Sequence, residues 1–218
     1  ASSRIGQLFA QCAMPDDIAD AVRRAYAGLG EGDAPVAVRS SATAEDLPGA
    51  SFAGQQETYL NIRGAEAVLE AVKKCWASLW TARAIAYRAR QGIAPGSVAL
   101  AVVVQKLVFA DVAGVMFTAN PITGKRDEIV INAACGLGEA IVSGAVTPDT
   151  LTVEKATGRI IRRETAEKQA MTVRAETGTR EVPVPDSQKK RTALTGAQAA
   201  ELVKLGADIE KLYEMPMD

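Results

Sequence analysis

The chain has 218 residues, of which 48% are hydrophobic and 23% charged, and its 25 Lys and Arg residues nearly balance its 26 Asp and Glu residues. This composition is typical of a globular protein, and the net charge of −1 excludes a protein that coats nucleic acid by its overall charge. The absence of histidine excludes a Ser-His-Asp triad, a histidine-ligated zinc site and a phosphohistidine within these residues.

The first half of the chain predicts helices around two extended segments. Apolar residues at helical spacing predict one helix before Pro15 and a second from Pro15 to about Gly28, with Asp16 and Asp17 in its first turn. Strands are predicted at 36–39 and 55–62, on either side of a small and polar stretch, and one long amphipathic helix is predicted from 65 to about 90.

The second half of the chain is rich in predicted strands. Short runs of Val and Ile bounded by turn residues predict strands at 97–109, 114–118 and 128–133, a short helix at 138–143, and a hairpin at 150–155 and 159–163. The stretch 174–193 is predicted to be mainly loop, and Thr195 is predicted to cap a final helix. The pattern indicates an α+β fold with mixed or antiparallel sheets.

The segment from Val36 to Thr58 carries the clearest chemical signal. Arg39 leaves a buried strand and enters a run of hydroxyl residues, and a Gly-Ala-Ser-Phe-Ala-Gly sequence follows at 49–54. A guanidinium, hydroxyls and unhindered backbone amides are the groups that bind a triphosphate. The segment matches neither of the common phosphate-binding motifs, GxxxxGK[ST] and GxGxxG. On the residues alone, a solvated loop with a surface ion pair at Arg39 is an equal alternative.

Four stretches resemble one family. They are AVRSSATAEDLPGASFAGQQETYLN (37–61), GVMFTANPITG (114–124), INAACGLGEAIVSGAVTPDT (131–150) and YEMPMD (213–218). Together they resemble, from residue 35 to residue 218, the nucleotide-binding domain of phosphoenolpyruvate synthase, pyruvate phosphate dikinase and rifampicin phosphotransferase. The resemblance implies an ATP-grasp-like fold, incomplete at both ends, that holds ATP between two lobes. Residues 1–104 would supply helices, a phosphate-contacting strand and a glycine-rich lid, and residues 105–218 a hinge strand, a sheet-rich lobe and a C-terminal helix.

The resemblance also implies roles for individual residues. Arg39 corresponds to the catalytic, phosphate-binding arginine of the family, and Gly54 and Thr58 correspond to the lid over the β- and γ-phosphates. The adenine would be read by a hinge made of Gln105, Lys106, Leu107 and Val108, with Val103 and Leu107 covering the ring. Without the resemblance, Gln105 would be a polar residue on an edge strand.

Magnesium is implied as a second cofactor beside ATP. Glu139 is a candidate carboxylate near the metal, or a favourable acid at a helix N-terminus. Asp218 resembles the first acid of the family's Asp-x-Glu signature, in which carboxylate oxygens hold Mg²⁺. Thr118 and Asn120 could face the nucleotide or form the turn before Pro121.

The expected function is the ATP-binding part of a phosphoenolpyruvate synthase-like dikinase. Such an enzyme splits ATP to AMP, phosphorylates a histidine on a separate swivelling domain and passes the phosphoryl group to pyruvate. The alternatives are the same part of a rifampicin phosphotransferase, a non-catalytic ATP-responsive module, or a structural α+β interaction domain. The family's Gly-Gly-Lys segment and its terminal Glu, Gln and Arg have no counterpart here, so the isolated chain is expected to have little turnover.

The expected partners follow from the same resemblance. The phosphohistidine carrier domain and the acceptor-binding domain are both expected outside this chain. Neither nucleic acid nor a membrane is expected as a partner, because the clustered basic residues are few and no apolar run is long enough to span a bilayer. The three scattered cysteines are typical of reduced thiols, and a cytoplasmic location is expected.

Overall fold

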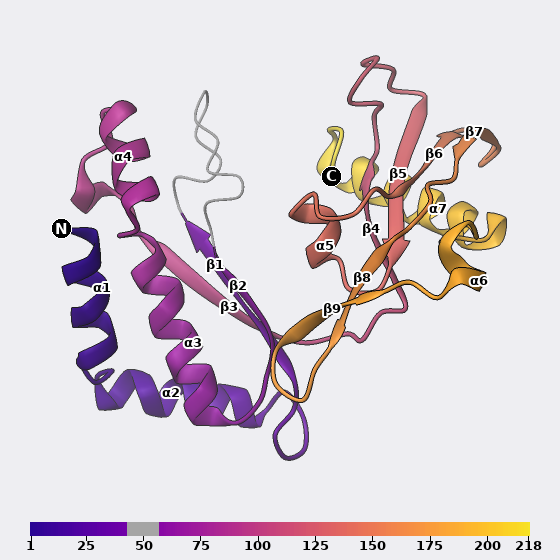
Figure 1. The fold of residues 1–218 in the computed structure, drawn as a ribbon. Coiled ribbons are helices and arrows are strands. Elements are labelled where there is room, and N and C mark those ends of the chain that lie inside the picture. The colour runs from indigo at the N-terminus through magenta and orange to yellow at the C-terminus, as the bar shows by residue number, and fades with distance from the viewer. Residues whose placement is uncertain (43–56) are drawn as a thin grey trace. The chain divides into compact units, whose positions relative to one another are not determined.

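The computed structural model describes residues 1–42 and 57–218, except for the side chain of Pro95 (Figure 1). The described chain is an α+β protein, and the ladders of its two larger sheets are antiparallel, which confirms the predicted class. It divides into two compact units. Unit 1 comprises Ala1–Val108 and Arg174–Thr179, and unit 2 comprises Phe109–Val173 and Arg180–Asp218.

Unit 1 is built on a three-stranded sheet with the strand order β2-β1-β3. The sheet and its helices are β1 (Val36–Ala42), β2 (Thr58–Ile62), β3 (Leu100–Lys106), α1 (Ser2–Gln11), α2 (Asp16–Ala27), α3 (Ala65–Ser78) and α4 (Ala82–Arg90), with a 3₁₀ turn η1 at Pro95–Ser97. The central strand β1 is paired along its whole length with β3, from Val36 opposite Lys106 to Ala42 opposite Leu100.

The core of unit 1 lies between the sheet and α3. Val36 and Val38 of β1 and Val68 and Val72 of α3 are each at most 3% exposed and belong to one cluster with Tyr26 of α2. Burying each such side chain contributes roughly 1.5–3 kcal/mol relative to leaving it in water. The Tyr26 hydroxyl donates to the carbonyl oxygen of Ala34, so its polar end is satisfied inside this core.

The single long helix predicted for 65–90 is wrong, because the structure has two helices there. The residues from Leu79 to Thr81 interrupt it, and Thr81 adopts an extended conformation in which its hydroxyl accepts a hydrogen bond from the amide of Ala84. That cap starts α4 as a new helix. The apolar spacing remains in phase across the interruption, so periodicity alone does not reveal it.

A β-bulge shapes the other edge of this sheet. The register of β1 with β2 shifts between Val36 and Val38, where β2 contains one extra residue, and Asn61 has a positive φ of 55°. Asn61 is 1% exposed, and its side-chain amide donates to the carbonyl oxygens of Ala175 and Gly178. The bulge therefore anchors the segment Arg174–Thr179 to unit 1.

Unit 2 is built on a four-stranded sheet with the order β4-β5-β6-β7, and a further two-stranded pair, β8-β9. The strands are β4 (Val112–Phe117), β5 (Glu128–Cys135), β6 (Asp149–Glu154), β7 (Ile160–Glu164), β8 (Ala170–Arg174) and β9 (Thr179–Pro183). The helices are α5 (Glu139–Val142), α6 (Asp186–Lys189) and α7 (Gly196–Tyr213). The loop predicted at 174–193 is wrong in part, because it contains β9 and α6.

Helix α7 covers one face of the four-stranded sheet. Ile129 and Ile131 of β5 and Leu151 of β6 form a buried cluster with Ala199 and Val203 of α7. Thr195 caps this helix as the sequence predicts, and a full capping box with Gln198 is present. No helix in the described ranges 1–42 and 57–218 is long and apolar enough to cross a membrane.

A buried ion pair in unit 2 joins the start of β6 to the loops that contain Lys168 and Arg191. Lys168 and Asp149 are 1% and 2% exposed, and the Lys168 ammonium lies 2.5 Å from one oxygen of the Asp149 carboxylate. The same ammonium donates to the carbonyl oxygens of Ala166 and Arg191, and Asp149 accepts from the amides of Ala166 and Ala193. Each charged group is therefore hydrogen-bonded on several sides, as a buried charge requires.

Candidate functional site

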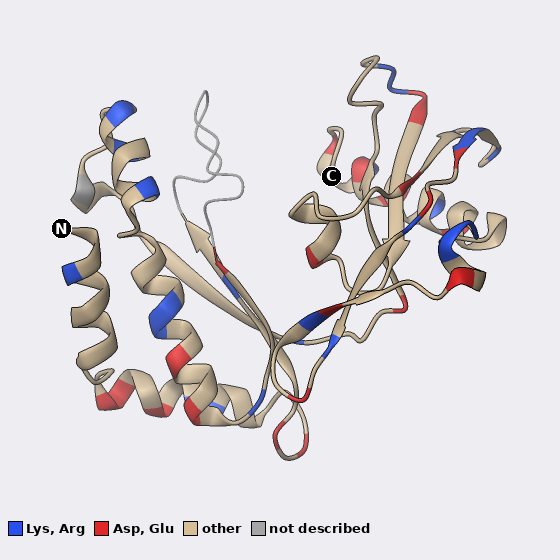
Figure 2. Ribbon diagram, in the orientation of Figure 1, with Lys and Arg blue, Asp and Glu red and all other residues tan. Residues whose placement is uncertain are grey.

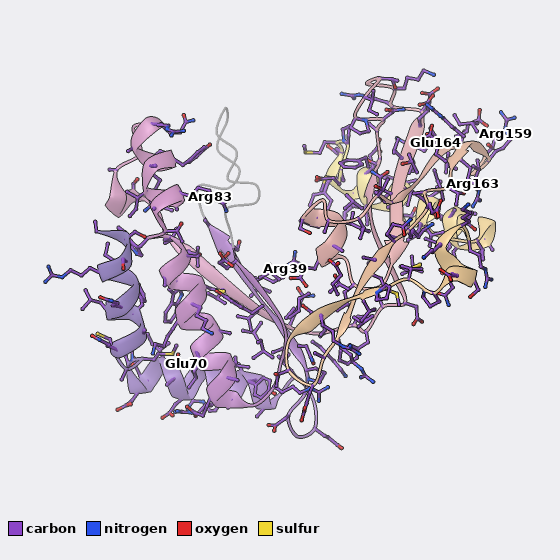
Figure 3. All side chains as sticks on the ribbon, viewed as in Figure 1. Arg39, Glu70, Arg83, Arg159, Arg163 and Glu164 are labelled. Atoms are coloured by element: carbon purple, nitrogen blue, oxygen red, sulfur yellow. The ribbon has the colours of Figure 1, made fainter. Side chains whose placement is uncertain are left out.

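The candidate site in unit 1 is the face of the three-stranded sheet that points away from α3. Side chains alternate along a strand, so Val36 and Val38 face the core while Arg39 faces the opposite side. Thr58 of β2 and Val103 of β3 lie directly opposite Arg39 in the two neighbouring strands, and Gln105 lies opposite Ala37. Opposite residues share a face of the sheet, so the structure brings these side chains together. Figure 3 shows Arg39 extending from β1 on this side.

The side chains of the candidate site are close neighbours across adjacent strands. Directly opposite residues have Cβ atoms about 4.5–5.5 Å apart, and diagonal neighbours such as Arg39 and Gln105 about 7–8 Å. Arg39, Thr58 and Gln105 are all exposed, and Val103 between them is 45% exposed. The face thus offers a guanidinium, a hydroxyl, a carboxamide and an apolar surface to one ligand.

The predicted hinge, residues 105–108, consists of the last two residues of β3 and the two residues after it. Lys106 ends β3 and is exposed, and Val108 is 75% exposed. The amide of Leu107 donates to the carbonyl oxygen of Pro35 over 2.9 Å. This amide is engaged within unit 1, so any adenine contact of the hinge would use its other backbone groups.

The predicted lid is the part of the site that the structure does not describe. Gly54 and the Gly49–Gly54 sequence lie outside the described residues. At the edge of this segment, the carbonyl oxygen of Glu57 accepts from the amide and the hydroxyl of Ser40, both over 3.4 Å. The end of β1 and the start of β2 are therefore held side by side next to Arg39.

The two predicted metal ligands both lie in unit 2 and are both exposed. Glu139 starts α5 beside Gly138, where an added Cβ would lie 3.4 Å from the side chain of Ala113. Asp218 follows Met217, whose amide donates to the Thr118 hydroxyl. Five residues separate Ala113 from Thr118, or roughly 17 Å along an extended strand, so the structure does not bring the two anchors together.

The chemistry of these two carboxylates suits magnesium, which accepts one or two protein carboxylates and completes its shell with phosphate and water. Among the residues that the structure describes, no group of three Asp, Glu or Cys side chains is placed to hold a metal ion. A magnesium ion at either acid would therefore need further oxygen ligands beyond the described carboxylates.

Thr118 and Asn120 have structural partners. Thr118 is 2% exposed, and its hydroxyl accepts from the amide of Met217. The side-chain oxygen of Asn120 accepts from the amides of Ile122 and Thr123, and its amide group donates to Glu128. The contacts of Asn120 are those of the turn alternative, whereas Thr118 is bonded to the C-terminal segment instead.

Glu128 is held ionised by its neighbours. Hydrogen bonds from Lys125 and then Asn120 lower the pKa of its carboxyl group below the ordinary value. Glu210 of α7 is similar, because burial would raise its pKa but hydrogen bonds from Lys155 and Thr118 and nearby positive charges outweigh that effect and lower it. Both carboxylates therefore stabilise unit 2 as anions.

Two sets of residues were missed by the sequence reasoning. The sequence predicts Asn61 only as part of a strand, although an asparagine one residue before a strand ends, in the sequence Asn-Ile-Arg-Gly, is compatible with a bulge. Asp149 and Lys168 carry no short motif, since the partners are 19 residues apart. A buried pair of this kind becomes visible only when the fold is known.

Comparison with known proteins gives one consistent family. A model described as the pyruvate phosphate dikinase AMP/ATP-binding domain matches residues 1–218. A probable phosphoenolpyruvate synthase of Methanocaldococcus jannaschii is 54% identical over 223 residues, which cover 100% of this chain and 19% of that protein. The phosphoenolpyruvate synthase of Pyrococcus furiosus is 52% identical, covering 94% of this chain and 26% of that protein.

The similarity extends to a second kind of relative. The rifampicin phosphotransferase of Bacillus subtilis is 45% identical over 218 residues, which cover 100% of this chain and 25% of that protein. The chain spans between 19% and 26% of the length of these three relatives. The family resemblance stated from the sequence motifs is confirmed.

Proposed function

Because the chain belongs to the pyruvate phosphate dikinase AMP/ATP-binding domain family, we propose that it supplies the ATP site of a phosphotransferase of the phosphoenolpyruvate synthase kind. In the whole enzyme, ATP is split to AMP and a histidine on a separate swivelling domain is phosphorylated. Pyruvate then takes the phosphoryl group. The fold of the domain is ATP-grasp-like, and the carrier histidine lies elsewhere, since these 218 residues contain none.

The observation that carries this proposal is the shared face of Arg39, Thr58 and Gln105. Arg39 and Thr58 are direct cross-strand neighbours, and Gln105 lies two residues further along β3. Two residues of a strand span roughly 7 Å, so one nucleotide can contact Gln105 with its base and Arg39 with its phosphates. Val103, directly opposite Arg39, provides an apolar surface beside the base.

In the proposed mechanism, Arg39 places a positive charge next to the phosphates. Its guanidinium can make two parallel hydrogen bonds to phosphate oxygens and stabilise the charge that develops as the phosphoryl group is transferred. Thr58 donates its hydroxyl to a neighbouring phosphate oxygen. Magnesium, when bound, would neutralise phosphate charge. Glu139 and Asp218 are the candidate acids of this chain, and because they are anchored apart, a given ion would be held by one or the other of them.

The test is substitution of Arg39 in the complete protein. Arg39→Ala should lower the rate of phosphoryl transfer by roughly 10²–10³-fold, and Arg39→Lys should restore part of it. Arg24→Ala, at an exposed position in the last turn of α2, is the matched control. Activity of Arg39→Ala within about threefold of the parent would refute the assignment.

The names of the relatives favour one second candidate for the acceptor. Rifampicin phosphotransferases match the chain over its full length, so rifampicin replaces pyruvate as acceptor in this alternative. An assay of the complete protein with ATP and each acceptor separates the two. Binding of ATP with neither product formed would instead favour the non-catalytic ATP-responsive module.

A further inference from the structure

Three cross-strand pairs between β1 and β3 form a row on the sheet face that bears Arg39. The pairs are Ala37 with Gln105, Arg39 with Val103, and Ser41 with Ala101. Alternate residues of a strand point to the same face, so the three pairs follow one another along this side of the sheet. Ser41 supplies the hydroxyl of the row, and the mechanism proposed above gives it no role.

The row is covered at one end and open at the other. Ala37 is 5% exposed, although it lies on the same face as Arg39. Arg39, Ser41 and Ala101 are all exposed. A ligand that lies along the row therefore has a covered end at Ala37 and an open end at Ser41.

The two adjacent serines of β1 differ in what they contact. The amide and the hydroxyl of Ser40 both donate to the carbonyl oxygen of Glu57, over 3.4 Å. Ser40 therefore holds the end of β1 against the residue that precedes β2. Ser41 is the next residue, so it points to the opposite face, where it is exposed. Its hydroxyl is thus placed to meet a ligand on the face of Arg39.

The charge on this face suits an anion. The strands β1, β2 and β3 contain Arg39 and Lys106 and no Asp or Glu, and Figure 2 shows β3 in tan over most of its length. Glu57, just before β2, lines a hollow together with Lys74 and Ser78 of α3, on the other side of the sheet. A phosphate beside Arg39 would therefore meet a guanidinium and a hydroxyl, and no carboxylate of these strands.

The chemistry of the two ends gives the direction in which a nucleotide would lie. The carboxamide of Gln105 can both donate and accept, as the edge of a base requires, whereas Arg39 and Ser41 can donate to phosphate oxygens. In the proposed function the acceptor histidine lies outside these 218 residues, which contain none, so the reacting phosphates have to face the open end. Both arguments place the base at Gln105 and the phosphates toward Ser41.

The length of the row suits a nucleoside triphosphate. Gln105 and Ala101 are four residues apart on β3, or roughly 13 Å. AMP held by its base at Gln105 would end near Arg39, whereas the two further phosphates of ATP would continue toward Ser41. We propose that the Ser41 hydroxyl binds the terminal phosphate of ATP and that Ala101, directly opposite, leaves the space for it. The inference rests on the proposed function, since it takes this face to be the ATP site.

Ser41 and Ala101 would then set the preference of the site for ATP over AMP. The family is described as an AMP/ATP-binding domain, and the two nucleotides differ only in the two terminal phosphates. A contact with the base or the first phosphate changes both affinities, whereas a contact with the last phosphate changes only that for ATP. Ser41 is therefore a specificity-determining residue of the site, separate from Arg39 and Gln105.

The experiment is calorimetric titration of the complete protein, with Mg²⁺ present, using AMP, α,β-methylene-ADP and α,β-methylene-ATP. The methylene group replaces the oxygen between the first two phosphates, so the triphosphate analogue is not split to AMP. Ser41→Ala should weaken binding of the triphosphate analogue roughly tenfold and leave the other two affinities within about twofold. Ser41→Thr keeps the hydroxyl and should retain most of the affinity. Ser3→Ala, at an exposed position of α1, is the matched control and should change none of the three affinities.

A second variant tests the space instead of the hydrogen bond. Ala101→Leu places a larger side chain opposite Ser41, at an exposed position of a strand at the edge of its sheet. It should weaken binding of the triphosphate analogue roughly tenfold and binding of AMP by less than about twofold. Equal losses for the triphosphate analogue and AMP in both variants would show a structural effect and overturn the proposal. A diphosphate analogue weakened as much as the triphosphate by Ser41→Ala would overturn the assignment to the terminal phosphate.

The same titrations separate this inference from the proposed function. A parent protein that binds the triphosphate analogue, with a ratio of triphosphate to AMP affinity that Ser41→Ala leaves unchanged, refutes the role of Ser41 alone. A parent protein that binds none of the three nucleotides refutes the proposed function, and this inference with it.

Discussion

Removing the buried ammonium of Lys168 tests the energetics of unit 2 directly. Lys168→Met keeps the length of the side chain but leaves the carboxylate of Asp149, 2% exposed, without its counter-charge. Breaking a buried ion pair from one side costs about 3–5 kcal/mol. The amides of Ala166 and Ala193 still donate to Asp149, but the carbonyl oxygens of Ala166 and Arg191 lose their donor. We therefore expect Lys168→Met to lower the free energy of unfolding by about 4 kcal/mol.

The double variant Asp149→Asn with Lys168→Met distinguishes charge from packing. It removes both charges, so no uncompensated charge stays buried, and it should recover about 1–2 kcal/mol of the loss. Urea unfolding followed by circular dichroism gives the free energies, and hydrogen exchange at the amides of Ala166 and Ala193 reports the local contacts. A cost below about 1 kcal/mol for Lys168→Met, or a double variant less stable than the single one, would refute the reasoning.

Two further predictions concern packing and pH. Gly114→Ala should destabilise the protein by about 3 kcal/mol in thermal unfolding, because a Cβ there collides with the backbone of Asn132 in the paired strand. The control is Gly6→Ala inside α1, where a Cβ meets nothing within 4 Å, and this change should be neutral or slightly stabilising. Equal effects of the two substitutions on stability would contradict the prediction. Glu210→Gln should lower the free energy of unfolding by about 1 kcal/mol at pH 7. The lowered pKa of Glu210 gives stability that is present above its unfolded pKa of about 4.3 and is lost as the pH falls through the folded pKa. A cost of the substitution that grows on acidification would contradict this sign.

Much of the architecture could be predicted from local pattern. The apolar spacing of α1 and α2, the alternation of β1 and the Thr195 cap of α7 are short-range features, and the structure has them where the sequence indicates. The interruption between α3 and α4 could not be read, because Leu79–Thr81 is compatible with a helix and the choice depends on the capping contact of Thr81.

The sequence nominates the residues of the candidate site but does not give their arrangement. Motif similarity points to Arg39, Thr58 and Gln105 separately, and only the antiparallel register of β1 with β2 and β3 puts them on one face. The contacts of Asn61 and of Lys168 depend on segments that are far away in the sequence. Long-range pairing of this kind leaves no periodic signal in a single sequence.

The anchoring of Arg174–Thr179 by Asn61 matters to anyone who dissects this polypeptide. A fragment that stops at Val108 contains every helix and strand of the three-stranded sheet, yet it omits the two carbonyl groups that receive the Asn61 amide. Such a fragment would carry an orphaned carboxamide in its interior. A fragment or chimera of unit 1 should therefore include Arg174–Thr179 and should not end at Val108.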